Sequence, residues 1–171
     1  MEKTQDVDKF CTLDSMKAAY LPYHGRLALG VCLLGTFNNL LNILLLAQKN
    51  MRTNPINLIL TGIAVADFLL SVEYIPFNAH MYLPDESSRD PEELYSIHWG
   101  IFLLFHTNFT IMIHNVSVCL TLSLAIWRLV MIRFPALSVR LCTLVRCRSV
   151  LITCYGSNFL LFSFISIFLL H

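Results

Sequence analysis

The stretch TNPINLILTGIAVADFLLSVEYIPF, residues 53–77, decides how this chain must fold. It opens on a helix start, because Asn54 can cap a helix and Pro55 fits a first helical turn. The apolar run then continues over 56–82, longer than the roughly 20 helical residues that cross a ~30 Å hydrocarbon core. Its charges are confined to two acids, one of them Asp67 near mid-depth. The stretch therefore predicts a membrane-spanning helix.

Three more apolar stretches of similar length, 25–47, 97–127 and 149–170, accompany it. Only 13% of the 171 residues are charged and 56% are hydrophobic, whereas a soluble domain carries roughly 25% charged residues. A spanning segment must satisfy its own backbone hydrogen bonds, so each stretch should be helical. The predicted fold is an all-α transmembrane bundle over 25–171, after an extracellular segment at 1–24, with helices at about 25–47, 56–82, 97–134 and 149–170.

The loops between these stretches differ in charge. The loop at 48–55 has two basic residues and no acid, and the loop at 83–96 has five acids and one arginine. The loop at 128–148 has no acid and five arginines, which are Arg128, Arg133, Arg140, Arg146 and Arg148. The positive-inside rule places the two basic loops in the cytoplasm. We therefore predict a multi-pass plasma-membrane protein with an extracellular N-terminus, in contact with lipid and not with nucleic acid.

Six cysteines and two glycosylation sequons are also present. Only Cys11 lies clearly in a segment predicted to be extracellular, so we predict no disulfide. The sequons begin at Asn108 and Asn115, inside the third predicted helix, and we expect neither to be glycosylated.

Polar residues inside the predicted spans are costly in a bilayer and mark candidate sites. Asparagines such as Asn39 are explained by hydrogen bonds between helices. A lone carboxylate such as Asp67 must be neutral, paired, or beside water or a cation, which favours a functional polar site. His106 and His114 are eight residues apart and lack a metal-ligand set, so we expect them to form hydrogen bonds or face a cavity. No phosphate-binding or nucleophile motif is visible, so we predict neither an enzyme nor a cofactor.

Several of these residues occur at intervals that resemble those of rhodopsin-like, seven-helix G-protein-coupled receptors. Asn39, after Gly35, resembles the asparagine of the first-helix GxxxN motif, and Asp67 follows it by 28 residues, as in that family. Ser117 lies eleven residues before Arg128, which occupies the place of the DRY arginine. Asn57, Trp99 and Pro135 also fit the family spacing.

The departures from the family pattern point to a subgroup. Trp127 replaces the acid before the arginine, and Leu129 replaces the tyrosine after it. Leu103 stands about where the third-helix cysteine is usual, and Tyr155 near the place of the fourth-helix tryptophan. With these features the sequence resembles the myosuppressin and FMRFamide-type neuropeptide receptors, a branch that includes the nematode serpentine class W receptors.

The resemblance implies a receptor mechanism. An extracellular peptide would bind between the outer ends of the helices, and the inner face would open to a heterotrimeric G protein. Asp67, Asn39 and Ser117 would form a polar core that can hold sodium. Arg128 would be the inner switch, and Trp127 beside it leaves that arginine without a neighbouring carboxylate.

The resemblance also indicates where a ligand would bind. Thr110 occupies the place where amine receptors carry an aspartate, which argues against a monoamine ligand. An acidic Glu73 would suit a basic peptide by charge complementarity. The candidate pocket residues are Glu73, Tyr74, Phe77, Thr110 and His114.

The resemblance covers four helices of seven, so we expect a truncated receptor that neither binds a ligand normally nor couples to a G protein. Two alternatives remain open. One is an unrelated four-span transporter or channel component, which would predict inverted repeats or paired outer cysteines. The other is a non-signalling truncated receptor that retains full-length receptors in the endoplasmic reticulum.

Overall fold

A computed structural model describes residues 2–82 and 96–170, and within those ranges every regular element is a helix. The helices are α1 (Glu2–Leu46), α2 (Pro55–Tyr82), α4 (Ile97–Arg133), α5 (Pro135–Leu141) and α6 (Leu144–Leu170). Four segments are long and apolar enough to cross a membrane, namely Tyr23–Leu46, Pro55–Tyr82, Ile97–Arg133 and Leu144–Phe168. The prediction of an all-α bundle with four spans is confirmed.

Capping side chains explain where several helices begin. Asn54 Oδ1 accepts a 3.0 Å hydrogen bond from the Ile56 backbone N–H at the start of α2. Ser96 Oγ accepts one of 3.3 Å from the Trp99 N–H at the start of α4. Thr143 Oγ1 accepts one of 3.5 Å from the third residue of α6. This last cap starts α6 at Leu144, five residues before the predicted position.

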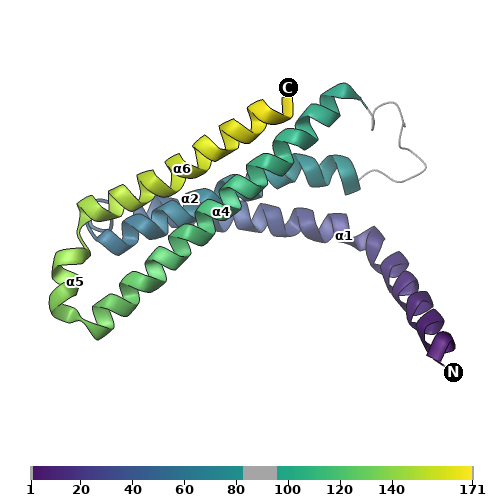
Figure 1. Ribbon diagram of the computed structural model, residues 1–171, viewed down its shortest axis with the longest axis horizontal. Coiled ribbons are helices and arrows are strands. Elements are labelled where there is room, and N and C mark those ends of the chain that lie inside the picture. The colour runs from purple at the N-terminus through teal and green to yellow at the C-terminus, as the bar shows by residue number, and fades with distance from the viewer. Residues whose placement is uncertain (1, 83–95, 171) are drawn as a thin grey trace.

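Two further features differ from the predicted helix boundaries. α1 begins at Glu2, because the helix continues through the polar segment that precedes the first span. Figure 1 shows this purple N-terminal part of α1 turning away from the other helices. Pro135 ends α4 and also opens the seven-residue helix α5, where proline fits the first turn.

α2 lies at the centre of the bundle and contacts α1, α4 and α6, while α4 also contacts α5 and α6. In Figure 1, α4 crosses in front of α2, and α5 connects the ends of α4 and α6. The apolar core joins three helices and consists of Ile59, Ala66, Ile113, Val116, Leu120, Leu124 and Cys147. Many large apolar side chains point outward, as expected when the solvent is lipid.

Close approach between helices depends on three glycines of the spans, and a Cβ on the first, Gly25 of α1, would overlap Tyr82 of α2. A Cβ on Gly62 of α2 would overlap the Leu151 side chain of α6. A Cβ on Gly35 of α1 would lie 2.8 Å from Ser71 Oγ of α2. Small residues at such crossings let membrane helices pack backbone to backbone. This packing fixes the position of α2, which carries most of the candidate site.

Candidate functional site

The predicted polar core lies where α2 faces α4. Ser117 Oγ donates a 2.9 Å hydrogen bond to Asp67 Oδ1, and both residues are half-buried. One turn further along α2, Ser71 Oγ donates a 2.8 Å bond to the Asp67 backbone carbonyl. A carboxylate in the middle of a span thus has a hydroxyl partner on the neighbouring helix, as the cost of an isolated charge in hydrocarbon requires.

Asn39, the third residue predicted for this core, takes no part in this hydrogen bond. It lies half-buried on α1, and within the described ranges it forms no hydrogen bond. A polar link between α1 and α2 lies nearer the C-terminal end of α2, where Asn78 Nδ2 donates a 3.5 Å hydrogen bond to Cys32 Sγ. The structure therefore joins Asp67 and Ser117 by a hydrogen bond, and Asn39 is hydrogen-bonded to neither.

A second buried polar pair lies one to two turns beyond Asp67 along α2. Glu73 Oε1 is 2.6 Å from His106 Nδ1, and the two side chains are 9% and 8% exposed. Thr110 Oγ1 donates a 3.4 Å hydrogen bond to the other carboxylate oxygen. Hydrogen bonds to an ionised group are roughly twice as strong as neutral ones. Two side chains of α4 thus satisfy the Glu73 carboxylate of α2 within the span.

Aromatic rings enclose this pair. The Phe77 ring stacks on the His106 imidazole, with centroids 4.1 Å apart and planes 10° apart. Tyr74 meets the same imidazole edge-on at 4.9 Å. We call Glu73, Tyr74, Phe77, His106 and Thr110 the outer cluster, because the charge pattern of the sequence predicts that this end of α2 faces outward. It contains four of the five residues predicted to line a ligand pocket.

The aromatic contacts continue to the outer end of α4. Trp99 stacks against Phe102 at 4.8 Å and lies 3.8 Å from the His80 ring. The indole Nε1 of Trp99 is buried and has no hydrogen-bond partner among the described residues. A donor of this kind beside an aromatic cluster offers a polar contact to a ligand.

Two histidines of the third span behave differently from each other. His114, predicted as a pocket residue, is exposed on α4 and is not a member of the outer cluster. His106 was expected only to form a hydrogen bond or face a cavity, and it forms the bond at the centre of the cluster. Pairing the ionisable groups of neighbouring spans would have identified it, because such groups rarely stay alone in a membrane.

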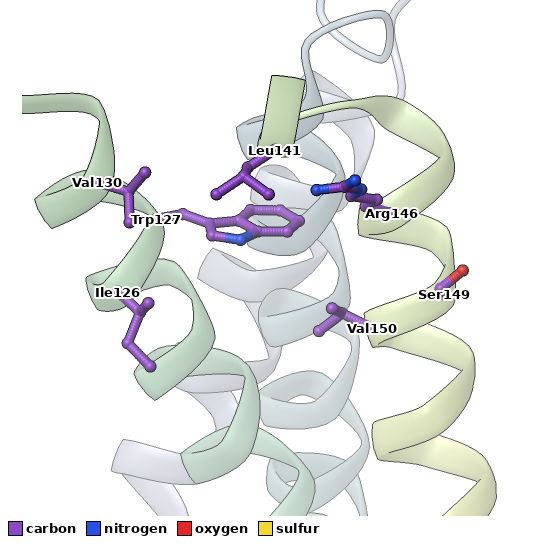
Figure 2. A pocket seen from close by; sticks show the side chains of 7 residues that line it. All are labelled: Ile126, Trp127, Val130, Leu141, Arg146, Ser149 and Val150. Atoms are coloured by element: carbon purple, nitrogen blue, oxygen red, sulfur yellow. The ribbon is translucent and has the colours of Figure 1, made fainter. Parts of the chain in front are cut away.

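Near the C-terminal end of α4, which the sequence predicts to be the inner end, Arg128 is exposed and forms no ion pair within residues 2–82 and 96–170. Its neighbour Trp127 turns inward and packs against the apolar core. Trp127 also lines an open pocket of about 360 Å³ where α4, α5 and α6 meet. Figure 2 shows its ring extending from α4 toward α6. The lining residues are Ile126, Trp127, Val130, Leu141, Arg146, Ser149 and Val150.

This inner pocket, and one link between α2 and α6, were not predicted from the sequence. The Tyr155 hydroxyl of α6 donates a 2.8 Å hydrogen bond to the Gly62 carbonyl of α2. The five described cysteines, from Cys32 to Cys154, are free thiols, and Cys11 lies outside the residues whose side chains are described. No cluster of three or more metal-binding His, Cys, Asp or Glu side chains exists in the described ranges.

Comparison with known proteins adds independent evidence. Residues 27–171 match the family described as serpentine type 7TM GPCR chemoreceptor Srw. The chain is 33% identical over 114 residues to G-protein coupled receptor dmsr-1 of Caenorhabditis elegans, covering 67% of this chain and 22% of that protein. It is 28% identical over 138 residues to the sex peptide receptor of Drosophila melanogaster, covering 80% of this chain and 31% of that protein. No solved structure matches significantly.

Proposed function

The chain belongs to the Srw family of serpentine, seven-transmembrane G-protein-coupled receptors, and we propose that it supplies helices one to four of a receptor for an extracellular peptide. It spans about a fifth and about a third of the two relatives that it matches. One of these relatives is named as a receptor for a peptide. The single observation that best supports a ligand site in this chain is the outer cluster around the Glu73–His106 pair.

The chemistry of the outer cluster suits part of a peptide. A carboxylate that lies within a span but near its outer end can meet a basic side chain, and the rings of Tyr74 and Phe77 offer apolar contact. Because His106 already holds Glu73 at 2.6 Å, an entering cation would share or replace that contact. The proposed ligand is therefore a peptide with a basic group next to an apolar one.

The proposed orientation places the outer cluster outside and the arginines of 128–148 in the cytoplasm. The N-terminus is then extracellular, and the protein acts at the plasma membrane. Arg128, exposed and without an acidic partner among the described residues, would be free to contact a heterotrimeric G protein. Trp127 supplies the packing that holds its turn of α4 in place.

We also propose a sodium ion at the Asp67–Ser117 pair. A carboxylate and a hydroxyl are the oxygen donors that hard cations prefer, and here they lie 2.9 Å apart on facing helices. Asn39, half-buried on α1, would supply an amide oxygen as a third ligand. An ion at this place would neutralise the carboxylate and link α2 to α4.

Signalling by the receptor whose reading frame contains residues 1–171 tests the proposal. Cells would express it with a G-protein activation sensor and receive peptides that carry a basic residue beside an aromatic one. We expect a saturable response, with lower potency in Glu73→Gln and with coupling lost but binding kept in Arg128→Ala. His114→Gln serves as the control, because His114 lies outside the outer cluster. Equal potency of Glu73→Gln and the native receptor would contradict the assigned site.

A further inference from the structure

The pocket at the junction of α4, α5 and α6, which we call the inner pocket, has no role in the proposed receptor mechanism. Its walls are apolar and come from all three helices, with Trp127 on one side, Leu141 above the ring and Val150 opposite. Its volume of about 360 Å³ falls within the roughly 300–1,000 Å³ of small-molecule sites. Figure 2 shows Arg146 beyond the far edge of the Trp127 ring.

The rim of this pocket favours an anion. Arg146 is exposed and forms no ion pair with any described acid. It lies in the first turn of α6, where Thr143 caps the backbone N–H of Arg146 itself and the helix dipole is positive. Ser149 adds a hydroxyl to the lining. An anionic group at the rim would thus meet a guanidinium and the positive end of a helix together.

The residues around the pocket are also positively charged. Arg128, Arg133, Arg140 and Arg148 are exposed on the same inner segment, and within the described part of the chain they form no ion pairs. The sequence from 128 to 148 contains no acid that could neutralise them. The cytoplasmic leaflet carries anionic lipids, which attract basic residues near the membrane by about 1 kcal/mol each.

We propose that the inner pocket binds one anionic phospholipid of the cytoplasmic leaflet. Its acyl chain would lie against Trp127 and Val150, and its headgroup phosphate would bind Arg146. A lipid fits better than a soluble anion, because the greater part of the lining is apolar and the pocket opens at the end of membrane spans. Since Trp127 precedes Arg128, a bound lipid would fix the turn of α4 that carries the proposed G-protein contact.

Tryptophan quenching in vesicles tests this site on the 171-residue chain itself. Trp99→Phe leaves Trp127 as the only tryptophan, because the chain has two. The probe is phosphatidylserine with brominated acyl chains, diluted into phosphatidylcholine, and compared with brominated phosphatidylcholine at the same mole fraction. We expect the anionic lipid to be enriched about fivefold at Trp127, the factor that corresponds to one basic contact.

Two matched variants separate a site from a generally basic surface. Arg146→Gln should abolish the fivefold preference, whereas Arg148→Gln removes the same charge from the same helix outside the pocket and should keep it. Val150→Phe fills the pocket and should lower quenching by phosphatidylserine while every arginine remains. Equal losses in Arg146→Gln and Arg148→Gln, or equal quenching by the two lipids, would overturn the proposal. So would protection of Trp127 from both lipids, which would indicate that protein covers the pocket.

Discussion

Ser117 Oγ on α4 donates a 2.9 Å hydrogen bond to Asp67 Oδ1 on α2, joining residues fifty positions apart in the sequence. The bond ties the central helix of the bundle to the helix that carries Arg128. Along α4, Ser117 lies between Thr110 of the outer cluster and Arg128, so the pair sits between the outer cluster and the inner end of α4. Its contribution to stability can be measured directly.

Ser117→Ala and Asp67→Ala should show a coupling energy of about 0.6–1.7 kcal/mol, the range of hydrogen bonds between membrane helices. The quantity to measure is the free energy of unfolding in detergent micelles for the two single variants and the double variant. Ser123→Ala is the matched control, because Ser123 only donates to the Cys119 carbonyl of its own helix. A coupling energy of zero would mean that the bond does not form in the membrane protein.

His106→Ala should destabilise the protein by about 3 kcal/mol, because it leaves the Glu73 carboxylate buried without its imidazole partner. The double variant His106→Ala with Glu73→Gln should recover part of that loss, since it removes the buried charge. The same unfolding measurement applies. His114→Ala, on the exposed face of α4, should change stability by less than about 0.5 kcal/mol. Equal losses of stability in His106→Ala and His114→Ala would contradict the pairing of Glu73 with His106 at the centre of the outer cluster.

Gly62→Ala should destabilise the bundle by about 1–3 kcal/mol, because the added methyl group overlaps Leu151 and separates α2 from α6. The change also strains the hydrogen bond from the Tyr155 hydroxyl to the Gly62 carbonyl. Gly156→Ala is the matched control, because nothing lies within 4 Å of a Cβ there. Thermal unfolding should show a lower midpoint temperature for Gly62→Ala and an unchanged one for Gly156→Ala. An equally lowered midpoint in both variants would contradict the close contact between Gly62 and Leu151.

Trp127 and Arg128 are neighbours at the inner end of α4, but they should affect different properties. Trp127 should affect the stability of the protein, and Arg128 its coupling to a G protein. Trp127→Ala should cost about 2 kcal/mol, less than for a fully buried tryptophan, because the ring is half-buried against the core. Arg128→Ala should leave stability within about 0.5 kcal/mol, because its side chain is exposed and forms no ion pair with the described residues. G-protein activation by the receptor should nevertheless be lost in Arg128→Ala. Unfolding and activation assays on the same variants check both statements.

The spans and the Asp67–Ser117 pair could be predicted from the sequence for different reasons. The spans follow from the length of each apolar stretch, because lipid leaves a helix as the only solution for the backbone. The pair follows from intervals between polar residues that match those of known receptors. The spans depend on local pattern along single helices, which the sequence shows directly, whereas the contact of the pair across two helices was predicted only from the resemblance.

The features that were not predicted depend on how helices meet. The pairing of Glu73 with His106 joins α2 to α4, and spacing along either helix does not indicate it. The inner pocket requires α5 to fold back beside α6, and α5 is only seven residues long. Asn39 was assigned to the polar core by its interval from Asp67, and an interval does not determine which hydrogen bonds its side chain forms.

The proposed receptor mechanism requires the outer cluster and Arg128 to lie toward opposite sides of the membrane. Two single-cysteine chains test this most directly, Ser88→Cys in the acidic sequence 83–96 and Val139→Cys on α5, whose native side chain is 79% exposed. A membrane-impermeant maleimide should label Ser88→Cys on intact cells, and Val139→Cys only after the membrane is permeabilised. Labelling of Val139→Cys on intact cells, with Ser88→Cys protected, would contradict the orientation and with it the receptor mechanism.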